Sequence, residues 1–192
     1  MEIGLIALTS YLLGSIPFGF LLTKIFLKKD IRKIGSGNIG ATNALRTGNK
    51  VIGYSTLILD ILKAVIPILI IKVQFPEFIF ISSLCVFLGH VFPIWLKFKG
   101  GKGVATYVGI LFCINYILGF FFIISWAIVF LISRYSSLSS LLASLLIPIC
   151  HYFFIDTKNY YFFIIMFILI FYTHKENIKR LKNNTESKTK IY

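Results

Sequence analysis

Acidic residues are scarce in this chain of 192 residues, which has 7 aspartates and glutamates against 20 lysines and arginines and a formal net charge of +13. The few carboxylates are scattered, so no cluster of them predicts a metal site. Charged residues of both signs make up only 14% of the chain, whereas 57% of it is apolar and its mean hydropathy is +0.86. This composition excludes a soluble domain of this length and predicts an integral membrane protein.

Cysteine is equally scarce. Cys85, Cys113 and Cys150 each lie in an apolar run and lack the spacing of metal or redox sites, so we interpret them as packing residues. The first apolar stretch does not resemble a cleavable signal peptide, because Glu2 precedes it and the lysines follow it. No repeat or low-complexity linker is apparent, and we expect a single membrane domain over residues 1–192.

Long apolar runs predict an all-α bundle of membrane-spanning helices. A helix needs roughly 20 residues to cross a bilayer, and the candidate runs are residues 3–23, 51–71, 78–96, 138–155 and 160–173. The uncharged run 104–133 is too long for one span and short for two, and residues 115–119 suggest a turn within it. We expect seven crossings, some of them short, or five if this run is one long or re-entrant element.

The basic residues predict an orientation for these spans. Most of them lie in a loop at residues 28–50, a loop at 97–103 and a tail at 174–192. By the positive-inside rule these three segments are cytoplasmic and the N-terminus is outside. The positive charge also attracts anionic lipids and anionic substrates. Nucleic acid is not an expected partner, because the aromatic residues lie in the spans.

The most informative stretch is GHVFPIWLKFKGGKGVAT, residues 89–106, in which an uncharged run ends in three lysines and three glycines. Glycines let backbone N–H groups approach an anion, and Lys102 adds a point charge suited to phosphate. Thr106 lies in the first turn of the next expected helix, whose N-terminus favours an anion. The stretch therefore predicts a phosphate site; the alternative is a basic loop that only sets topology.

The loop at residues 28–50 has a related composition. Its core, GSGNIGATNALR, combines flexible glycine backbone with hydroxyl, amide and guanidinium groups. Such groups can bind a phosphate and orient a hydroxyl-bearing substrate. The residues concerned are Gly35, Ser36, Gly37, Asn38, Gly40, Thr42, Asn43 and Arg46.

Two spacings imitate unrelated enzymes. The glycines of the first loop satisfy G-x-G-x-x-G, with Asp60 further along, but no buried strand precedes them, so we reject a dinucleotide-binding fold. His151 and Asp156 match the His-x4-Asp spacing of CoA-dependent acyltransferases. They lie in apolar surroundings on the side opposite the basic loops, and we interpret the match as chance.

Ionisable residues within the spans are few. Asp60 and Lys63 share a helix face and can neutralise each other. An intramembrane pair is a functional hint, although Asp60 can instead orient a loop residue. His90 lies near the cytoplasmic end of the third span, and we interpret it as a hydrogen-bonded structural group.

Two further polar segments lie on the expected cytoplasmic side. The first, RYSSLSS at residues 134–140, is hydroxyl-rich and compatible with an ordinary helix N-cap. In the tail, His174 and Asn177 share a helix face and suit a polar site at the membrane boundary. Glu176 and Arg180 have the i, i+4 spacing of a helical ion pair.

Five motifs together make the chain similar to the bacterial acyl-phosphate:glycerol-3-phosphate acyltransferases, the PlsY type. They are GSIPFG at Gly14, GSGNIGATN at Gly35, GHVFP at Gly89, KGGKGVAT at Lys99 and HKENIKRL at His174. The resemblance extends from the first span to the tail, where Thr173 and Asn184 replace a frequent arginine and glycine.

The resemblance implies transfer of a fatty acyl group from acyl phosphate to the 1-hydroxyl of glycerol 3-phosphate, which gives lysophosphatidic acid. It also implies a place in the bacterial cytoplasmic (inner) membrane with the active site at the cytoplasmic face, among membrane lipids. Functional coupling to the enzyme that makes acyl phosphate is expected, and no cofactor or metal is.

Residue roles are expected from the local patterns above together with this resemblance. The residues expected to carry catalysis are Ser36, Arg46, Lys102, His174 and Asn177. Those expected to bind substrate are Gly35, Gly37, Asn38, Gly40, Thr42, Asn43, Gly100, Gly101, Gly103, Thr106 and Ser137. Structural support is expected from Asp60, Lys63, His90 and Glu176.

The chemistry of the donor favours direct transfer. Acyl phosphate already carries a good leaving group, so the protein has to position two anions and stabilise developing charge. We expect the glycerol hydroxyl to attack directly and the donor's phosphate to accept its proton, with His174 as general base the alternative. The competing functions are a transporter or channel for phosphorylated metabolites and a CoA-dependent acyltransferase that uses His151 and Asp156.

Overall fold

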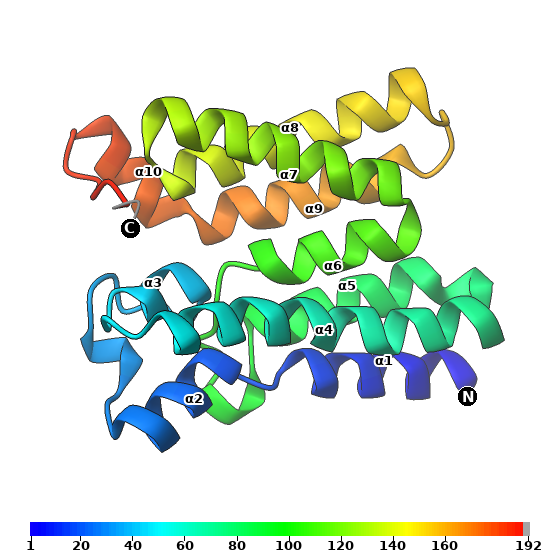
Figure 1. Ribbon diagram of the computed structural model, residues 1–192. Coiled ribbons are helices and arrows are strands. Elements are labelled where there is room, and N and C mark those ends of the chain that lie inside the picture. The colour runs from blue at the N-terminus through cyan, green and yellow to red at the C-terminus, as the bar shows by residue number, and fades with distance from the viewer. Residues whose placement is uncertain (190–192) are drawn as a thin grey trace. The chain divides into compact units, whose positions relative to one another are not determined.

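The structure, a computed structural model, describes residues 1–189 as helices joined by loops, without a strand in that range (Figure 1). The expected all-α membrane fold class is therefore confirmed. The last residues of the predicted tail, including Lys190, lie outside the described residues. The α-helices are α1 (Glu2–Gly14), α2 (Phe18–Leu27), α3 (Ala41–Leu45), α4 (Lys50–Gln74), α5 (Ile79–Val91), α6 (Val104–Ile114), α7 (Tyr116–Ser133), α8 (Ser136–Phe154), α9 (Tyr160–Thr173) and α10 (Lys175–Lys182), and the 3-10 helices are η1 (Ile31–Lys33), η2 (Pro76–Phe78) and η3 (Ile94–Leu96).

The chain divides into two compact units, one over Met1–Ile114 and one that begins at Asn115. In the first unit α4 is the central helix, because it contacts each of α1, α2, α3, α5 and α6. In the second unit α8 lies against both α7 and α9, and the three helices run alongside one another (Figure 1).

Several helical stretches have the length and composition of membrane spans. Four qualify among the described residues, namely Glu2–Leu27, Pro76–Leu96, Tyr116–Ser133 and Ser136–Phe154, and α9 with α10, bent by 62°, makes a fifth if the pair is one span. Seven crossings would also require α4, with its two central charges, and α6, which at 11 residues is roughly 16 Å long. The count of seven and the orientation stay predictions.

The turn expected inside the long uncharged run is confirmed. α6 ends at Ile114 and α7 begins at Tyr116, so the run forms two helices. Asn115 between them is the N-cap of α7, and its side-chain oxygen accepts a hydrogen bond from the backbone N–H of Ile117 at 2.9 Å. An asparagine cap satisfies an N–H group that the helix itself leaves unpaired, which fixes where α7 begins.

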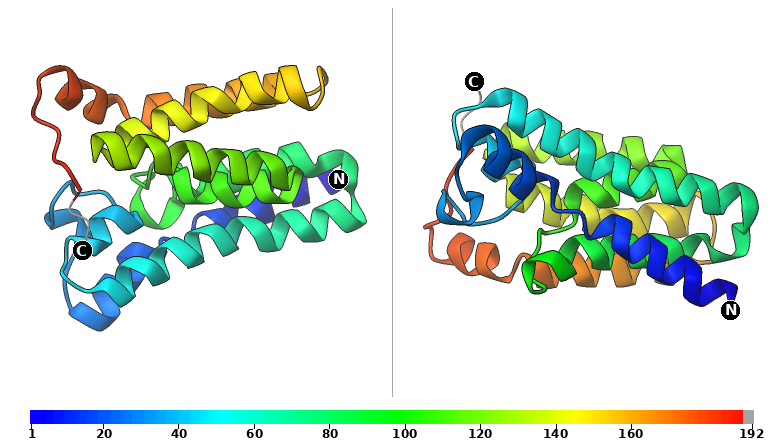
Figure 2. Two further views of the ribbon diagram at one scale, coloured as in Figure 1. Left: turned by 45° about the horizontal axis from the view of Figure 1, so that its top comes forward. Right: turned by 90° about the horizontal axis from the view of Figure 1, so that it is seen from below.

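The first apolar run is broken at residues 15–17, within GSIPFG, whose proline and glycines predict a kink (Figure 2, right). The proline of this segment lacks an N–H group and cannot continue the helix. The glycines beside the break permit close packing, since a Cβ atom at Gly14 would collide with the backbone of Val86. Gly89 meets the carbonyl of Tyr11 in the same way. α1 and α5 therefore pack backbone against backbone.

Candidate active site

The first loop is organised by the buried side chain of Asn43 in α3. Its amide nitrogen donates to the carbonyl oxygens of Ile31, Ile34 and Asn38 at 3.2, 2.9 and 2.8 Å. Its amide oxygen accepts from the backbone N–H of Ser36 at 3.0 Å. The structure thus uses Asn43, which the sequence predicted to contact substrate, to hold the loop in one conformation.

Ser36 and Arg46 lie on the exposed side of this loop. Gly35 precedes the serine with φ +53°, a left-handed conformation that favours glycine. A Cβ atom there would lie 2.5 Å from the amide oxygen of Asn43 and 2.8 Å from Cδ of Arg46. The side chain of Arg46 therefore passes over Gly35, beside the serine. An anion that approaches the loop from solvent would meet a hydroxyl and a guanidinium together.

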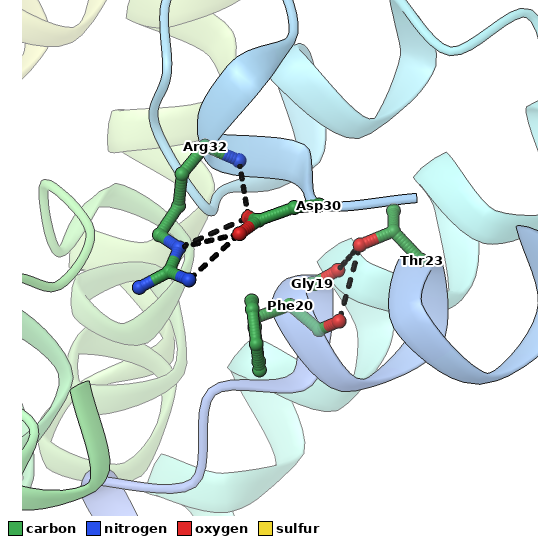
Figure 3. Close-up of polar contacts among 5 residues, drawn as sticks. All are labelled: Gly19, Phe20, Thr23, Asp30 and Arg32. Carbon is green, nitrogen blue, oxygen red and sulfur yellow. Dashed lines mark hydrogen bonds and ion pairs between the residues drawn. The ribbon is translucent and has the colours of Figure 1, made fainter. Parts of the chain in front are cut away.

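The start of the loop is fixed by Asp30 and Arg32. The Asp30 carboxylate accepts from the backbone N–H of Arg32 at 3.0 Å and pairs with its guanidinium at 2.7 Å (Figure 3). The guanidinium also lies 4.8 Å from the ring centroid of Phe20 on α2. The hydrogen bond from the Arg32 side chain lowers the pKa of Asp30 to about 2. The pair therefore stays ionised at neutral pH and ties the loop to α2.

An apolar cluster connects the two predicted loops within the first unit. Leu96 of η3, the residue before the loop at 97–103, packs in one core with four residues of the first loop and the start of α4. Because these side chains share one core, both loops are attached to the same part of the unit. The cluster consists of Ile31, Ile39, Ala44, Ile52 and Leu96.

The loop at residues 97–103 folds back onto the end of α5. The N–H groups of Gly100 and Gly101 donate to the carbonyl oxygens of Val91 and His90 at 3.0 and 3.1 Å. A Cβ atom at Gly101 would collide with the His90 ring. The sequence predicted these glycines as phosphate contacts, but the structure uses both N–H groups internally. Lys102 and the first turn of α6, whose N–H groups have no partner within the helix, are the better anion contacts.

Three of the residues predicted as structural support form one buried group. Lys63 lies 2.8 Å from Oδ1 of Asp60 and donates to the carbonyl oxygen of Ile16 at 2.9 Å. Nδ1 of His90 is 3.7 Å from the same carboxylate oxygen. The group joins α4, α5 and the break between α1 and α2, and the His90 ring packs on Gly101. The arrangement favours a supporting role behind the loop at residues 97–103.

The second unit gathers three donors around one carboxylate, that of Glu186. The hydroxyl of Ser137 donates to it at 2.7 Å, the amide nitrogen of Asn177 at 2.6 Å and Nε of Arg180 at 2.6 Å. Burial alone would raise the pKa of Glu186, but the hydrogen bonds and the arginine charge outweigh it and lower the pKa. Glu186 is therefore ionised at neutral pH, and the three donors form an anion-binding group.

This arrangement corrects one prediction and adds a residue. Arg180 pairs with Glu186 and not with Glu176, which is exposed on α10. The i, i+4 rule finds partners only within a helix, whereas Glu186 lies beyond the end of α10. The one signal in the sequence was that Glu186 is the single carboxylate after Glu176 in the basic tail.

His174 is buried at the junction of α9 and α10. Its Nδ1 lies 2.8 Å from the carbonyl oxygen of Ile170. A carbonyl can only accept, so Nδ1 carries the proton and Nε2 is the basic nitrogen of the neutral ring. The side chain therefore has the tautomer that a general base acting through Nε2 requires.

The rejected His-x4-Asp pair does not form a catalytic dyad within the described residues. The His151 ring packs against that of Phe163 with centroids 4.6 Å apart. The Asp156 carboxylate accepts from the backbone N–H of Lys158 at 2.9 Å. Each side chain is therefore engaged in local structure, in agreement with the interpretation that the spacing is chance.

Comparison with known proteins gives consistent matches along the whole chain. A family model described as glycerol-3-phosphate acyltransferase matches residues 4–184. A glycerol-3-phosphate acyltransferase of Pelagibacter ubique (strain HTCC1062) is 72% identical over 192 residues, which cover 100% of both chains. One of Bartonella henselae (strain Houston 1) is 50% identical over 190 residues, 96% of this chain and 90% of that protein.

Two solved structures are also similar to the chain. Both are crystal structures of PlsY (YgiH), an integral membrane glycerol 3-phosphate acyltransferase, at 35% identity over 98% of this chain. The glycerol 3-phosphate form has a TM-score of 0.92 and is covered to 96%, and the lysophosphatidic acid form has a TM-score of 0.89 and is covered to 95%.

Proposed function

The chain belongs to the glycerol-3-phosphate acyltransferase family and is an integral membrane protein, and from this premise we propose that it transfers a fatty acyl group from acyl phosphate to the 1-hydroxyl of glycerol 3-phosphate. The products are lysophosphatidic acid and phosphate, in the first step of phospholipid synthesis. The reaction takes place at the cytoplasmic face of a bacterial inner membrane. Family membership argues for an acyltransferase and against the transporter.

The observation that carries the proposal is the geometry of the first loop. Asn43 locks the loop by four hydrogen bonds, and Ser36 and Arg46 are held at its exposed edge. A planar guanidinium can bind a phosphate through two parallel hydrogen bonds. A hydroxyl beside it can orient the glycerol part of the acceptor or the acyl phosphate. Lys102, on the second loop of the same unit, supplies further positive charge.

The reaction needs no covalent nucleophile from the protein. The 1-hydroxyl oxygen of glycerol 3-phosphate forms a bond to the carbonyl carbon of the acyl phosphate, and the bond from that carbon to the phosphate oxygen breaks. The hydroxyl proton passes to the departing phosphate. Arg46 and Lys102 stabilise the negative charge that develops on the carbonyl and phosphate oxygens. Holding the two reactants together supplies the remaining acceleration.

Two experiments distinguish this route from its alternatives. Trapping of an acyl group on Ser36 after the protein is mixed with acyl phosphate alone would contradict direct attack. His174 is the alternative proton acceptor, since its Nε2 is the basic nitrogen. A His174→Ala variant that keeps a near-full rate would remove that alternative, whereas a loss restored by raising the pH would support it.

The reaction itself is tested with purified protein in detergent and labelled glycerol 3-phosphate. Palmitoyl phosphate and palmitoyl-CoA are compared as donors, and labelled lysophosphatidic acid is quantified. We expect product with the acyl phosphate alone, loss of it in Arg46→Ala and near-normal product in the control His151→Ala. Product with the CoA donor only, together with an inactive His151→Ala, would contradict the proposal.

A further inference from the structure

The chain beyond α10 turns back within the second unit. Asn184 has φ +55°, and the N–H of Thr185 donates to the carbonyl oxygen of Arg180 at 2.8 Å. Further along, the N–H of Thr189 donates to the carbonyl oxygen of Arg134 at 2.9 Å. The segment 183–189 therefore runs from the end of α10 to the turn between α7 and α8, and Glu186 is at its centre.

The position that Glu186 occupies has the chemistry of an anion site. Three side chains among the described residues donate hydrogen bonds to the carboxylate, and one of them, Arg180, is positively charged. Ser137 lies in the first turn of α8, where the helix dipole also favours an anion. The Glu186 side chain is only 8% exposed, so its carboxylate is held inside this group.

Two of the donors were singled out in the sequence: Ser137 is expected to bind substrate and Asn177 to carry catalysis. A carboxylate and a phosphate cannot share the same donors, because both are anions and would repel each other at contact distance. The carboxylate carries one charge, whereas a phosphate monoester carries up to two and has three acceptor oxygens. A phosphate can therefore displace the tail, at a cost set by the affinity of the tail for the donors.

We propose that Glu186 is a tethered competitor of the substrate phosphate: its carboxylate occupies the anion-binding group of Ser137, Asn177 and Arg180 and has to leave before a phosphate binds there. This inference rests on the proposed function, because the phosphate compounds concerned are the substrates of that reaction. A short tether keeps the carboxylate at a high effective concentration, so the docked state predominates when phosphate is absent.

The size of the effect follows from the docked fraction. The apparent affinity of a ligand is reduced by the fraction of protein that is competent to bind it. A tail docked for most of the time leaves roughly a third to a tenth of the protein competent, so its release tightens phosphate binding by about three- to tenfold. Because the tail competes with binding and not with the chemical step, the change belongs in KM and not in kcat.

The test uses the full-length protein with Glu186→Gln, which keeps the size of the side chain and removes its charge. Binding of inorganic phosphate, glycerol 3-phosphate and palmitoyl phosphate is titrated separately, and KM and kcat are measured for the two substrates. We expect at least one phosphate compound to bind about three- to tenfold more tightly, with kcat within about twofold of the wild type. The compound whose binding tightens is the one whose phosphate takes the place of the carboxylate.

The matched control is Glu77→Gln, which removes one negative charge from η2 in the first unit and leaves the tail intact. It should bind all three compounds as the wild type does. Unchanged or weaker binding of all three to Glu186→Gln would overturn the inference, and a lower Tm together with weaker binding would identify Glu186 as an organiser of the site. Absence of acyl transfer in the wild type would refute the proposed function, whereas the titrations would still decide this inference.

Discussion

At the scale of the residue, the buried side-chain amide of Asn43 supplies the hydrogen bonds that hold the first loop in its conformation. Asn43 bonds to four backbone groups of the loop. A buried backbone group that loses its partner costs about 1–3 kcal/mol. The exposed positions of Ser36 and Arg46 therefore depend on a side chain whose amide N–H groups are used within the loop.

Replacing Asn43 by alanine should unfold the loop and abolish activity. Four backbone groups of the loop would each lose a hydrogen bond to this side chain, so we expect the free energy of unfolding to fall by roughly 3 kcal/mol and the rate by at least about 100-fold. The measurement is Tm in detergent together with acyl transfer. Asn49→Ala, which removes only the cap on Ile52 at the start of α4, is the control, with a loss near 1 kcal/mol and most activity kept. Equal effects of the two changes would contradict the assigned role.

Arg46 is expected to contribute the paired N–H donors of its planar guanidinium and not merely its charge. Arg46→Lys keeps the charge but cannot bind a phosphate through two parallel hydrogen bonds. Because the side chain is exposed, we expect an unchanged Tm and a fall of about 10- to 100-fold in kcat/KM for acyl transfer. Arg32→Lys, in the same loop but paired with Asp30, should stay within about threefold. A fully active Arg46→Lys variant would show that Arg46 contributes only its positive charge.

At the scale of the element, the glycines of the loop at residues 97–103 fit it against α5. Gly101 faces the His90 ring, and Gly103, with φ +82°, faces the Phe87 ring. The sequence identified the loop as an anion site, but it could not show that the N–H groups of Gly100 and Gly101 are used by carbonyls of α5. Those carbonyls are exposed to the loop only because α5 ends at Val91, just before Pro93.

A methyl group at Gly101 should therefore displace the loop. We expect Gly101→Ala to lower Tm and to reduce acyl transfer by at least about tenfold, because the new Cβ atom would overlap the buried ring of His90. Gly4→Ala in α1 is the control, since nothing lies within 4 Å of its Cβ position and alanine favours a helix. An active and stable Gly101→Ala would show that the loop tolerates another path.

The sequence was sufficient to predict those features of the fold that nearby residues cause. GSIPFG predicted the break between α1 and α2, because proline acts within its own helix, and Asn115 marked the start of α7. The hydrogen bonds from Asn43 to the first loop and the contact of Arg180 with Glu186 were not predictable from the sequence. Each depends on residues that tertiary structure brings together, and neither leaves a periodic pattern in the sequence.

At the scale of the whole molecule, composition and charge were enough to predict a helical membrane protein. The fold class is confirmed, whereas the number of crossings depends on whether α4 and α6 span the bilayer. α4 carries a neutralised ion pair, which lowers the cost of charge in the membrane. The distribution of basic residues predicts that the N-terminus is outside and the tail is cytoplasmic.

This orientation is tested with single cysteines in a chain whose three native cysteines are replaced by serine. Glu2→Cys should react with a membrane-impermeant maleimide in intact cells, and Lys182→Cys should react only in inverted vesicles. Each variant serves as the control for the other. Labelling of both positions from the same side would contradict an odd number of spans.

The most direct test of the account is the stoichiometry of acyl transfer by the full-length protein in vesicles that contain palmitoyl phosphate. Lysophosphatidic acid and released phosphate are measured in the same time course, with and without glycerol 3-phosphate. We predict one phosphate for each lysophosphatidic acid and no release of phosphate in the absence of the acceptor, because the acceptor hydroxyl attacks the donor directly. A burst of phosphate without acceptor would contradict direct attack by the acceptor hydroxyl. Lysophosphatidic acid formed only when palmitoyl-CoA is supplied would contradict acyl phosphate as the donor.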